Sequence, residues 1–203
     1  MTNYSSLPYS AGLMSQSFWF VEFKAVLRMI ANGKSDEEIK QISLSENLFG
    51  APNEYRSRRI CGYLLSRSKA VDADLLHLFL NADVDTQKLI NLVAILRGDR
   101  LFFEFVYEVY REKAYLGQLC LETLDVNSFF TRKGQQSDSI EIWNDTTKKK
   151  LKGIYFNFLT DAGLLRKENR VYFIKRIVPD DRLLFLLKRA DELSLQKAIT
   201  GEM

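Results

Sequence analysis

The sequence predicts a mainly α fold: a helical bundle that contains a helix-turn-helix-like pair, followed by a C-terminal winged-helix-like module with a short β-hairpin. Three observations lead to this prediction. Apolar residues recur at helical spacing along most of the chain, and residues that cap helix N-termini precede many of these segments. One β-branched and aromatic run near the C-terminus, RVYFIKRIV, follows a turn sequence and is typical of a strand.

The composition is that of a folded globular protein. Apolar residues make up 46% of the 203-residue chain and charged residues 27%, so extensive disorder is not expected. Cys61 and Cys120 lie far apart without a CxxC partner, which indicates neither a zinc site nor a disulfide framework and fits a reducing cytoplasm. The N-terminus has no signal-peptide pattern, and no apolar run approaches about 20 residues. We therefore expect neither secretion nor membrane insertion.

Seven helices are expected before residue 131. The first runs from Ser15 or Ser17 to Ile30, and the second begins at Ser35, which forms a capping box with Glu38. The others are predicted from their N-cap residues: Asn53 for the third, Asp72 or Asp74 for the fourth, Asp85 for the fifth, Asp99 for the sixth and Asp125 for a short seventh. Together they form the predicted N-terminal domain, residues 1–130.

The second predicted domain, residues 131–203, begins with an irregular linker. The segment TRKGQQSDS, residues 131–139, is rich in Gly, Ser and Gln and has little to bury. A helix is expected from Asp145 to Ala162, followed by a β-hairpin over residues 164–177 with its turn at KENR. Pro179 opens a last helix, predicted to continue to Leu193.

Positive charge is concentrated in two segments, although the net charge of the chain is only +3. Residues 53–69 hold five Lys and Arg against one Glu, and residues 147–176 hold nine against two acidic residues. Residues 70–131, in contrast, hold five basic and ten acidic residues. Such segregation of charge favours a polyanionic partner.

The helix that begins at Asp145 carries four lysines near its N-terminus, where the helix dipole makes cations unfavourable unless an anion compensates them. Helical spacing leaves Lys149, Gly153 and Asn157 on the side opposite the apolar face. The phosphates of DNA would supply the anion if this helix entered the major groove and the hairpin touched flanking phosphates. The DNA-contact candidates in this region are Lys148, Lys149, Lys150, Lys152, Asn157, Arg166, Lys167, Arg170 and Lys175.

The helix after Asn53 is the second basic surface. Together with the helix from Ser35 it could form a helix-turn-helix, although its turn is longer than the usual length of about three or four residues. Its candidates, expected to face outwards, are Arg56, Arg58, Arg59, Tyr63 and Arg67. These arginines could instead pair with the acidic middle segment. Tyr63, Phe156 and Tyr172 are the aromatic residues expected to remain exposed.

The sequence offers no constellation of catalytic residues. The single histidine, His77, lies among apolar residues in LLHLFL and is expected to be a packed core residue. Phosphate-loop, dinucleotide, nucleophile-elbow and zinc-protease motifs are absent. We therefore expect a protein that is not an enzyme, without a catalytic residue, metal, cofactor or small-molecule substrate.

Several segments together resemble one family. They are YSAGL, SFWFVEF, ENLF, RSRRICGYLLSR, DRLFFEFVYEVYREK and WNDTTKKKLKGIYFNFLTDAGLL, and they span nearly the whole chain. In this order and spacing the sequence resembles the BrxA proteins, small components of bacterial BREX (bacteriophage exclusion) defence systems. The resemblance implies a mostly helical cytoplasmic protein that binds double-stranded DNA beside other BREX components, including a site-specific DNA methyltransferase and large ATPases. It supplies no catalytic residues.

The combined prediction is a non-enzymatic accessory factor of phage defence. It would bind duplex DNA mainly through phosphates, with little base specificity. Two alternatives remain open. The basic surfaces could dock an acidic face of a protein partner, because lysine runs are common on solvated surfaces and some winged modules bind only protein. A helical bundle with this charge could also bind RNA.

Overall fold

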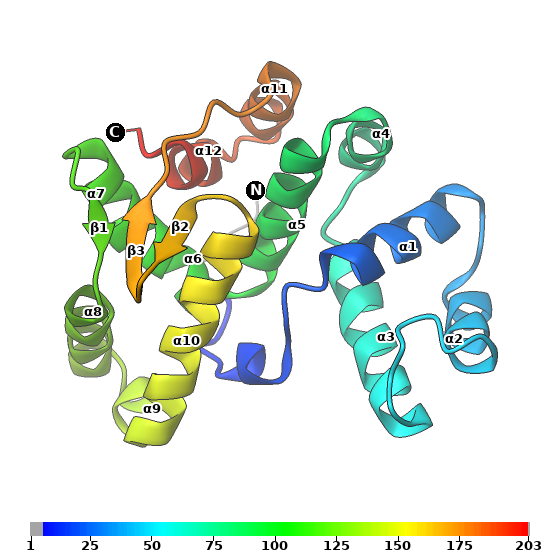
Figure 1. Ribbon diagram of the computed structural model, residues 1–203, viewed down its shortest axis with the longest axis horizontal. Helices are drawn as coiled ribbons and strands as arrows, with labels where there is room; N and C mark the ends of the chain where they lie inside the picture. The colour runs from blue at the N-terminus through cyan, green and yellow to red at the C-terminus, as the bar shows by residue number, and fades with distance from the viewer. Residues whose placement is uncertain (1–5, 203) are drawn as a thin grey trace.

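The structure is a computed structural model that describes residues 6–202, and it is mainly α, as the sequence predicts. In Figure 1, one side of the molecule is formed by the first three α-helices. The elements of this side and of the adjoining middle are η2 (Gly12–Ser15), α1 (Phe20–Ala31), α2 (Asp36–Ser45), α3 (Glu54–Ser68), α4 (Ala73–Asn81) and α5 (Val84–Gly98). Within the described residues, no helix is long and apolar enough to cross a membrane.

The other side contains the small sheet and the helices around it (Figure 1). Its elements are α6 (Arg100–Phe105), η3 (Val106–Tyr110), α7 (Arg111–Tyr115), β1 (Cys120–Leu121), α8 (Thr123–Gln136), α9 (Asp138–Glu141), α10 (Asp145–Asp161), β2 (Leu165–Glu168), β3 (Val171–Ile174), α11 (Asp181–Arg189) and α12 (Leu193–Thr200). The predicted sixth helix corresponds to α6, η3 and α7, with η3 as a π-helical segment between the two α-helical parts.

N-cap hydrogen bonds confirm most of the predicted helix starts. The capping box of Ser35 and Glu38 is complete, and Asn53, Asp72 and Asp99 each accept a hydrogen bond from a first-turn backbone N–H. Two predicted caps are wrong. The cap of α5 is Asp83 rather than Asp85, and α8 begins after Glu122, whose backbone N–H donates to Asp125. In both cases a nearby acidic residue two or three positions upstream takes the cap position.

The first α-helix starts later than predicted. Gly12–Ser15 forms a 3₁₀ turn, and α1 begins only at Phe20. The intervening Trp19 has φ of 46°, in the left-handed region that a bulky residue rarely adopts. Ser15 and Ser17 therefore do not cap α1, because tertiary contacts fix the conformation of the segment before this helix.

The segment that was expected to be an irregular linker is mostly helical. Residues 131–136 are the last part of α8, and Lys133 and Gly134 are buried there. The Lys133 ammonium lies 2.6 Å from both Glu104 and Glu108, so a polar segment is ordered by ion pairs that the sequence did not reveal. The division into residues 1–130 and 131–203 remains a prediction, but α8 continues across it.

The predicted hairpin is confirmed. β2 pairs antiparallel with β3, and Asn169 and Arg170 form the turn with φ of 46° and 72°. Two consecutive positive φ values are those of a type I′ turn, which matches the twist of the strands. β1 was not predicted, and it pairs with the other side of β3 to give the strand order β1-β3-β2.

Two further expectations near the C-terminus and α4 are wrong. The last helix is divided into α11 and α12 around Asp191, which has φ of 59°. His77 is exposed on α4 rather than packed in the core, because the inward positions of that helix are taken by Leu75, Leu78 and Phe79.

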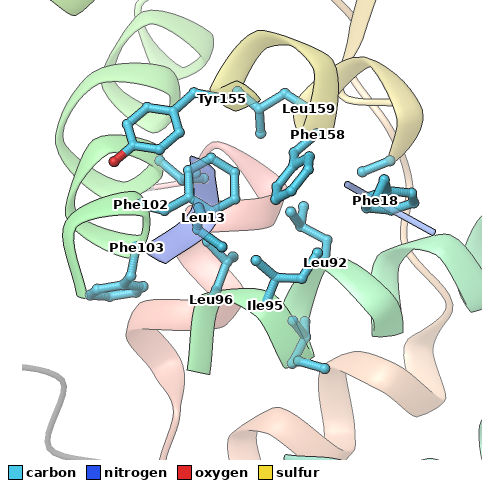
Figure 2. Close-up of a cluster of buried hydrophobic side chains, with 14 of the residues drawn as sticks. Leu13, Phe18, Leu92, Ile95, Leu96, Phe102, Phe103, Tyr155, Phe158 and Leu159 are labelled. Carbon is cyan, nitrogen blue, oxygen red and sulfur yellow. The ribbon is translucent and has the colours of Figure 1, made fainter. Parts of the chain in front are cut away.

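The hydrophobic core joins the N-terminal segment to α5, α6 and α10. Figure 2 shows Leu13 and Phe18 among side chains from these helices, including Phe102 and Phe158. The rings of Phe18 and Phe158 lie 6.0 Å apart, and those of Phe102 and Tyr155 lie 4.8 Å apart. Burial of such aromatic residues contributes strongly to stability, so the N-terminal segment is a structural part of the core.

Replacing Tyr155 with Phe should raise the free energy of unfolding. The Tyr155 hydroxyl is fully buried and makes no hydrogen bond with the described residues, whereas its ring stacks on Phe105 and packs at a tilt against Phe102. An unpaired buried hydroxyl costs desolvation energy, so its removal should stabilise the protein by about 1 kcal/mol in urea denaturation. Tyr155→Leu, which also removes the ring, should be destabilising. A Tyr155→Phe variant less stable than the parent would contradict this account.

Candidate nucleic-acid interface

The position of α10 is set by Asn144, whose Oδ1 accepts a hydrogen bond from Thr147 N at 2.8 Å. One side of the helix is buried through Leu151, Tyr155 and Leu159, as predicted. This cap places the lysine run directly after the first turn. The cations therefore lie at the positive end of the helix, and no carboxylate in the described part of the chain forms an ion pair with them.

The lysines of α10 differ in exposure. Lys149 and Lys150 are exposed, and Lys148 and Lys152 are partly buried. Lys152 donates a hydrogen bond to Asn127 of α8 at 3.2 Å, and this contact holds the Lys152 side chain in place. Farther along the helix, Asn157 is exposed on the predicted face.

Gly153 also lies on the exposed face of α10, and a Cβ atom there would meet no atom within 4 Å. Packing within the described structure therefore does not require glycine at this position. A glycine inside a helix costs about 1 kcal/mol relative to alanine. Its presence leaves a flat surface next to the lysines, across which a ligand could approach the backbone closely.

The hairpin is attached to α10 through an aromatic contact. Phe156 is buried, contrary to the expected exposure, because its ring stacks on Tyr172 of β3 with centroids 4.2 Å apart. The Lys167 ammonium lies over the same Tyr172 ring, 5.3 Å from its centroid. Tyr172 itself is half-buried. The hairpin and α10 thus present one connected surface.

The cations of the hairpin are exposed but not equivalent. Arg166, Lys167, Arg170 and Lys175 are all exposed. Arg166 forms an ion pair with Glu168 at 2.6 Å, which partly neutralises it. Lys167, Arg170 and Lys175 have no such carboxylate partner among the described residues. The predicted lysines of α10 and the predicted cations of the hairpin thus lie on two elements that pack against each other.

The predicted residues of α3 form a second, separate group. Arg56, Arg58 and Arg59 are exposed, and Arg58 pairs with Glu54 at 3.4 Å. Tyr63 is half-buried and stacks on Trp19. In Figure 1, α3 and α10 both point their N-terminal ends towards the lower edge of the view, with the η2 segment between them.

Arg67 does not face outwards, and this prediction is wrong. Its side chain is buried, and its guanidinium donates hydrogen bonds to the carbonyls of Phe18 at 2.7 Å and Ser17 at 3.1 Å. It also donates to the side chains of Gln16 and Asn91. Burial lowers the pKa of Arg67 to about 10, against a smaller opposing effect of Glu22. Arg67 therefore anchors the N-terminal segment and is not available to DNA.

Two aromatic residues at this surface, Tyr55 of α3 and Trp19, were not predicted from the sequence. Tyr55 is exposed next to Arg56, and Arg59 lies over both Tyr55 and Tyr63, 5.8 Å and 6.0 Å from their ring centroids. The spacing of Tyr55, Arg59 and Tyr63 at every fourth residue was a signal that could have indicated this. Trp19 is half-buried, and its ring stacks on that of Tyr63. Among the described residues, no group of acidic, His and Cys side chains is arranged to hold a metal ion.

Comparison with known proteins identifies the family. A model of the BrxA family matches residues 7–191. The chain belongs to the BrxA family. A relative from Bacillus cereus (strain H3081.97), named BREX protein BrxA, is 37% identical over 160 residues, which cover 79% of this chain and 80% of the relative.

The fold of this family member is also similar to a solved structure. The crystal structure of an uncharacterized protein from Magnetospirillum magneticum superposes with a TM-score of 0.81 at 14% identity. The match covers 96% of this chain and 99% of the other. At this level of identity the similarity concerns the fold alone.

Replacing Arg67 with Lys should destabilise the protein by about 2 to 4 kcal/mol, because the shorter ammonium cannot serve all four acceptors, which include the buried side-chain oxygen of Asn91. Arg56→Lys is the matched control on the exposed face of α3 and should change stability by less than about 0.5 kcal/mol. Urea denaturation of both variants measures the difference. Equal small effects would show that Arg67 is not an anchor.

Proposed function

We propose that this protein is a non-enzymatic accessory component of a BREX phage-defence system that binds double-stranded DNA in the cytoplasm. It would contact DNA mainly through phosphates and with little base specificity. The similarity to a relative named BREX protein BrxA supports the proposed role in a BREX system, and other BREX components are the expected protein partners. The observation that carries the DNA proposal is the set of lysines near the N-terminus of α10 that form no ion pair with any described residue, on a helix that packs against a basic hairpin.

The order of the elements supports this proposal. After α7 come β1, α8, the short α9, α10 and the β2–β3 hairpin, and the sheet has the order β1-β3-β2. This order is consistent with a winged-helix unit and supports the proposal that α10 is a recognition helix in the major groove. The hairpin would then lie beside the backbone. Such a unit would begin near residue 100, before the division predicted at residue 131.

The electrostatics of α10 also favour a phosphate ligand. Lysines near a helix N-terminus oppose the helix dipole, and an anion bound there is stabilised by both the cations and the free N–H groups. Lysine contributes a point charge rather than the forked hydrogen bonds with which arginine reads guanine. A surface formed mainly by Lys148, Lys149 and Lys150 is therefore suited to phosphates more than to base edges.

A second DNA contact is proposed at α3. α2 and α3 pack against each other, and residues 46–53 connect them. The connection is longer than in a helix-turn-helix, so this pair would add phosphate contacts through Arg56, Arg58 and Arg59 rather than repeat the docking geometry of α10. Five or six phosphate contacts in total would give a slope of about −5 for log K against log salt.

A protein–protein adaptor is the second candidate function. Exposed apolar side chains gather around β1 and the start of α8, namely Tyr115, Leu116, Leu119 and Leu124. Exposed apolar surface of this kind is typical of docking sites for other proteins. The two functions are compatible, because this region does not include the lysines of α10.

Charge reversal at Lys148 and Lys149 should weaken duplex binding without loss of stability. Glutamates near a helix N-terminus are favourable for the helix, so the double variant should unfold at the same or a higher urea concentration. Loss of two phosphate contacts should reduce the salt slope by about 2. Fluorescence anisotropy of a labelled duplex of about 30 base pairs, titrated at several salt concentrations, measures both effects.

The matched control is Lys188→Glu with Lys197→Glu, which changes the net charge equally on α11 and α12, at the upper edge of Figure 1. It should retain the parental salt slope. If both double variants lose affinity equally, the effect is one of net charge and the α10 surface is not the binding site. If neither the parent nor the variants bind duplex DNA, the adaptor function takes its place.

A further inference from the structure

A groove of about 470 Å³ lies between the N-terminal segment and α3. Its lining comes from residues 14–17 and Trp19 on one side, and from Asn53 and the part of α3 up to Tyr63 on the other. Most of these side chains are polar or aromatic, and the buried Ile60 adds apolar surface. The volume lies in the range of about 300 to 1,000 Å³ that small-molecule and nucleotide sites occupy. The duplex contacts proposed for α10 do not use this groove, whereas Arg56 and Arg59, proposed above as additional phosphate contacts, line it.

The walls of the groove carry exposed aromatic surface. Tyr55 is 71% exposed, so its ring is available to a ligand. Trp19 and Tyr63 are stacked on each other, with ring centroids 6.1 Å apart and an angle of 25° between the rings. A flat aromatic ligand could therefore stack on Tyr55 while the Trp19–Tyr63 pair bounds the other side.

Two arginines of the groove are not neutralised. Neither Arg56 nor Arg59 forms an ion pair with a carboxylate in the described part of the chain, whereas Arg58, outside the groove, pairs with Glu54. The Arg59 guanidinium lies over the rings of Tyr55 and Tyr63. Cations placed next to aromatic faces suit a ligand that has both a π-system and a negative charge.

The groove is held open by the backbone around it. Trp19 keeps a left-handed conformation because Arg67 and Asn91 both donate hydrogen bonds to the neighbouring carbonyl of Phe18. Strained residues of this kind persist where the surrounding structure fixes them, and they are concentrated at ligand sites. The Trp19 ring is therefore fixed in place before any ligand arrives.

We propose that this groove binds an unstacked nucleotide, with the base against Tyr55 and the phosphate on Arg56 and Arg59. The inference goes beyond duplex binding at α10 and does not rest on it. The nucleotide could belong to a DNA strand, as an extruded or single-stranded residue, or be a free mononucleotide. Both sources present the same aromatic base and phosphate, and they are separated by experiment.

The two tryptophans of the chain allow a direct test. Trp143→Phe leaves Trp19 as the single tryptophan, inside the groove and apart from α10. Titration of this variant with a 5′-phosphorylated eight-residue oligothymidylate should quench the fluorescence saturably, because a base enters next to the ring. The titration is repeated with thymidine monophosphate. Quenching by the oligonucleotide alone indicates a strand, and equal quenching by both indicates a free nucleotide.

Substitutions then decide whether the groove is the site. Tyr55→Ala and Arg56→Gln, both at exposed side chains, should each weaken binding at least about fivefold, the lower end of the effect of one stacked base. Lys69→Gln, at the other end of α3, removes the same charge as Arg56→Gln and should change binding less than about twofold. Equal losses in the Arg56 and Lys69 variants would overturn the proposal in favour of a general electrostatic attraction.

Repeating the titration in the Lys148→Glu, Lys149→Glu variant distinguishes nucleotide binding in the groove from duplex binding at α10. Quenching that persists there supports the groove whatever happens to duplex affinity. Absence of quenching by both ligands, in a protein with unchanged circular dichroism, would overturn the groove proposal and leave the α10 proposal untouched.

Discussion

The segment before α1 is the constraint on which the arrangement of the molecule depends. Near its start, Tyr9 donates a hydrogen bond to Glu104, and the Arg100 guanidinium lies 4.1 Å from the Tyr9 ring. Leu13 fills the core between α5 and α10, as Figure 2 shows. The end of the segment is held by Arg67. A single stretch of chain thus joins α3 to α10, and it fixes the two basic helices relative to each other.

This arrangement separates two uses of positive charge. Buried or partly buried cations act inside the fold: Lys133 pairs with Glu104 and Glu108, and Arg97 pairs with Glu192 at the start of α12. Although burial alone raises the pKa of Glu104, hydrogen bonds from Arg100 and Lys133 hold the pKa below its usual range. The lysines of α10 have no such partners among the described residues. Their compensation must come from solvent ions or from a ligand, which is why they are the centre of the functional proposal.

Local signals in the sequence were sufficient for much of the fold. The capping box at Ser35, the cap at Asn53 and the Asn169–Arg170 turn each depend on residues within about three positions, so they could be predicted. The apolar face of α10 followed from its period in the same way. Features set by distant contacts could not be predicted. The late start of α1 and the pairing of β1 with β3 depend on partners far along the chain.

The same distinction applies to the candidate site. Helical spacing gave the correct exposure for Lys149, Gly153 and Asn157, but it placed Arg67 outside, because a residue at the border of a helix face is turned inwards or outwards by its partners. Arg67 finds four acceptors on the N-terminal segment and α5, and none of them is near it in sequence. Charge counts likewise do not distinguish a buried lysine such as Lys133 from an exposed one.

Lysine footprinting can show whether α10 and the hairpin form the DNA surface. The protein is acetylated with a limiting reagent, with and without a duplex of about 30 base pairs, and each lysine is quantified by mass spectrometry. We expect protection at Lys148, Lys149, Lys150, Lys167 and Lys175, and no change at Lys40 or Lys188. Protection spread evenly over all exposed lysines, or confined to residues outside α10 and the hairpin, would contradict it.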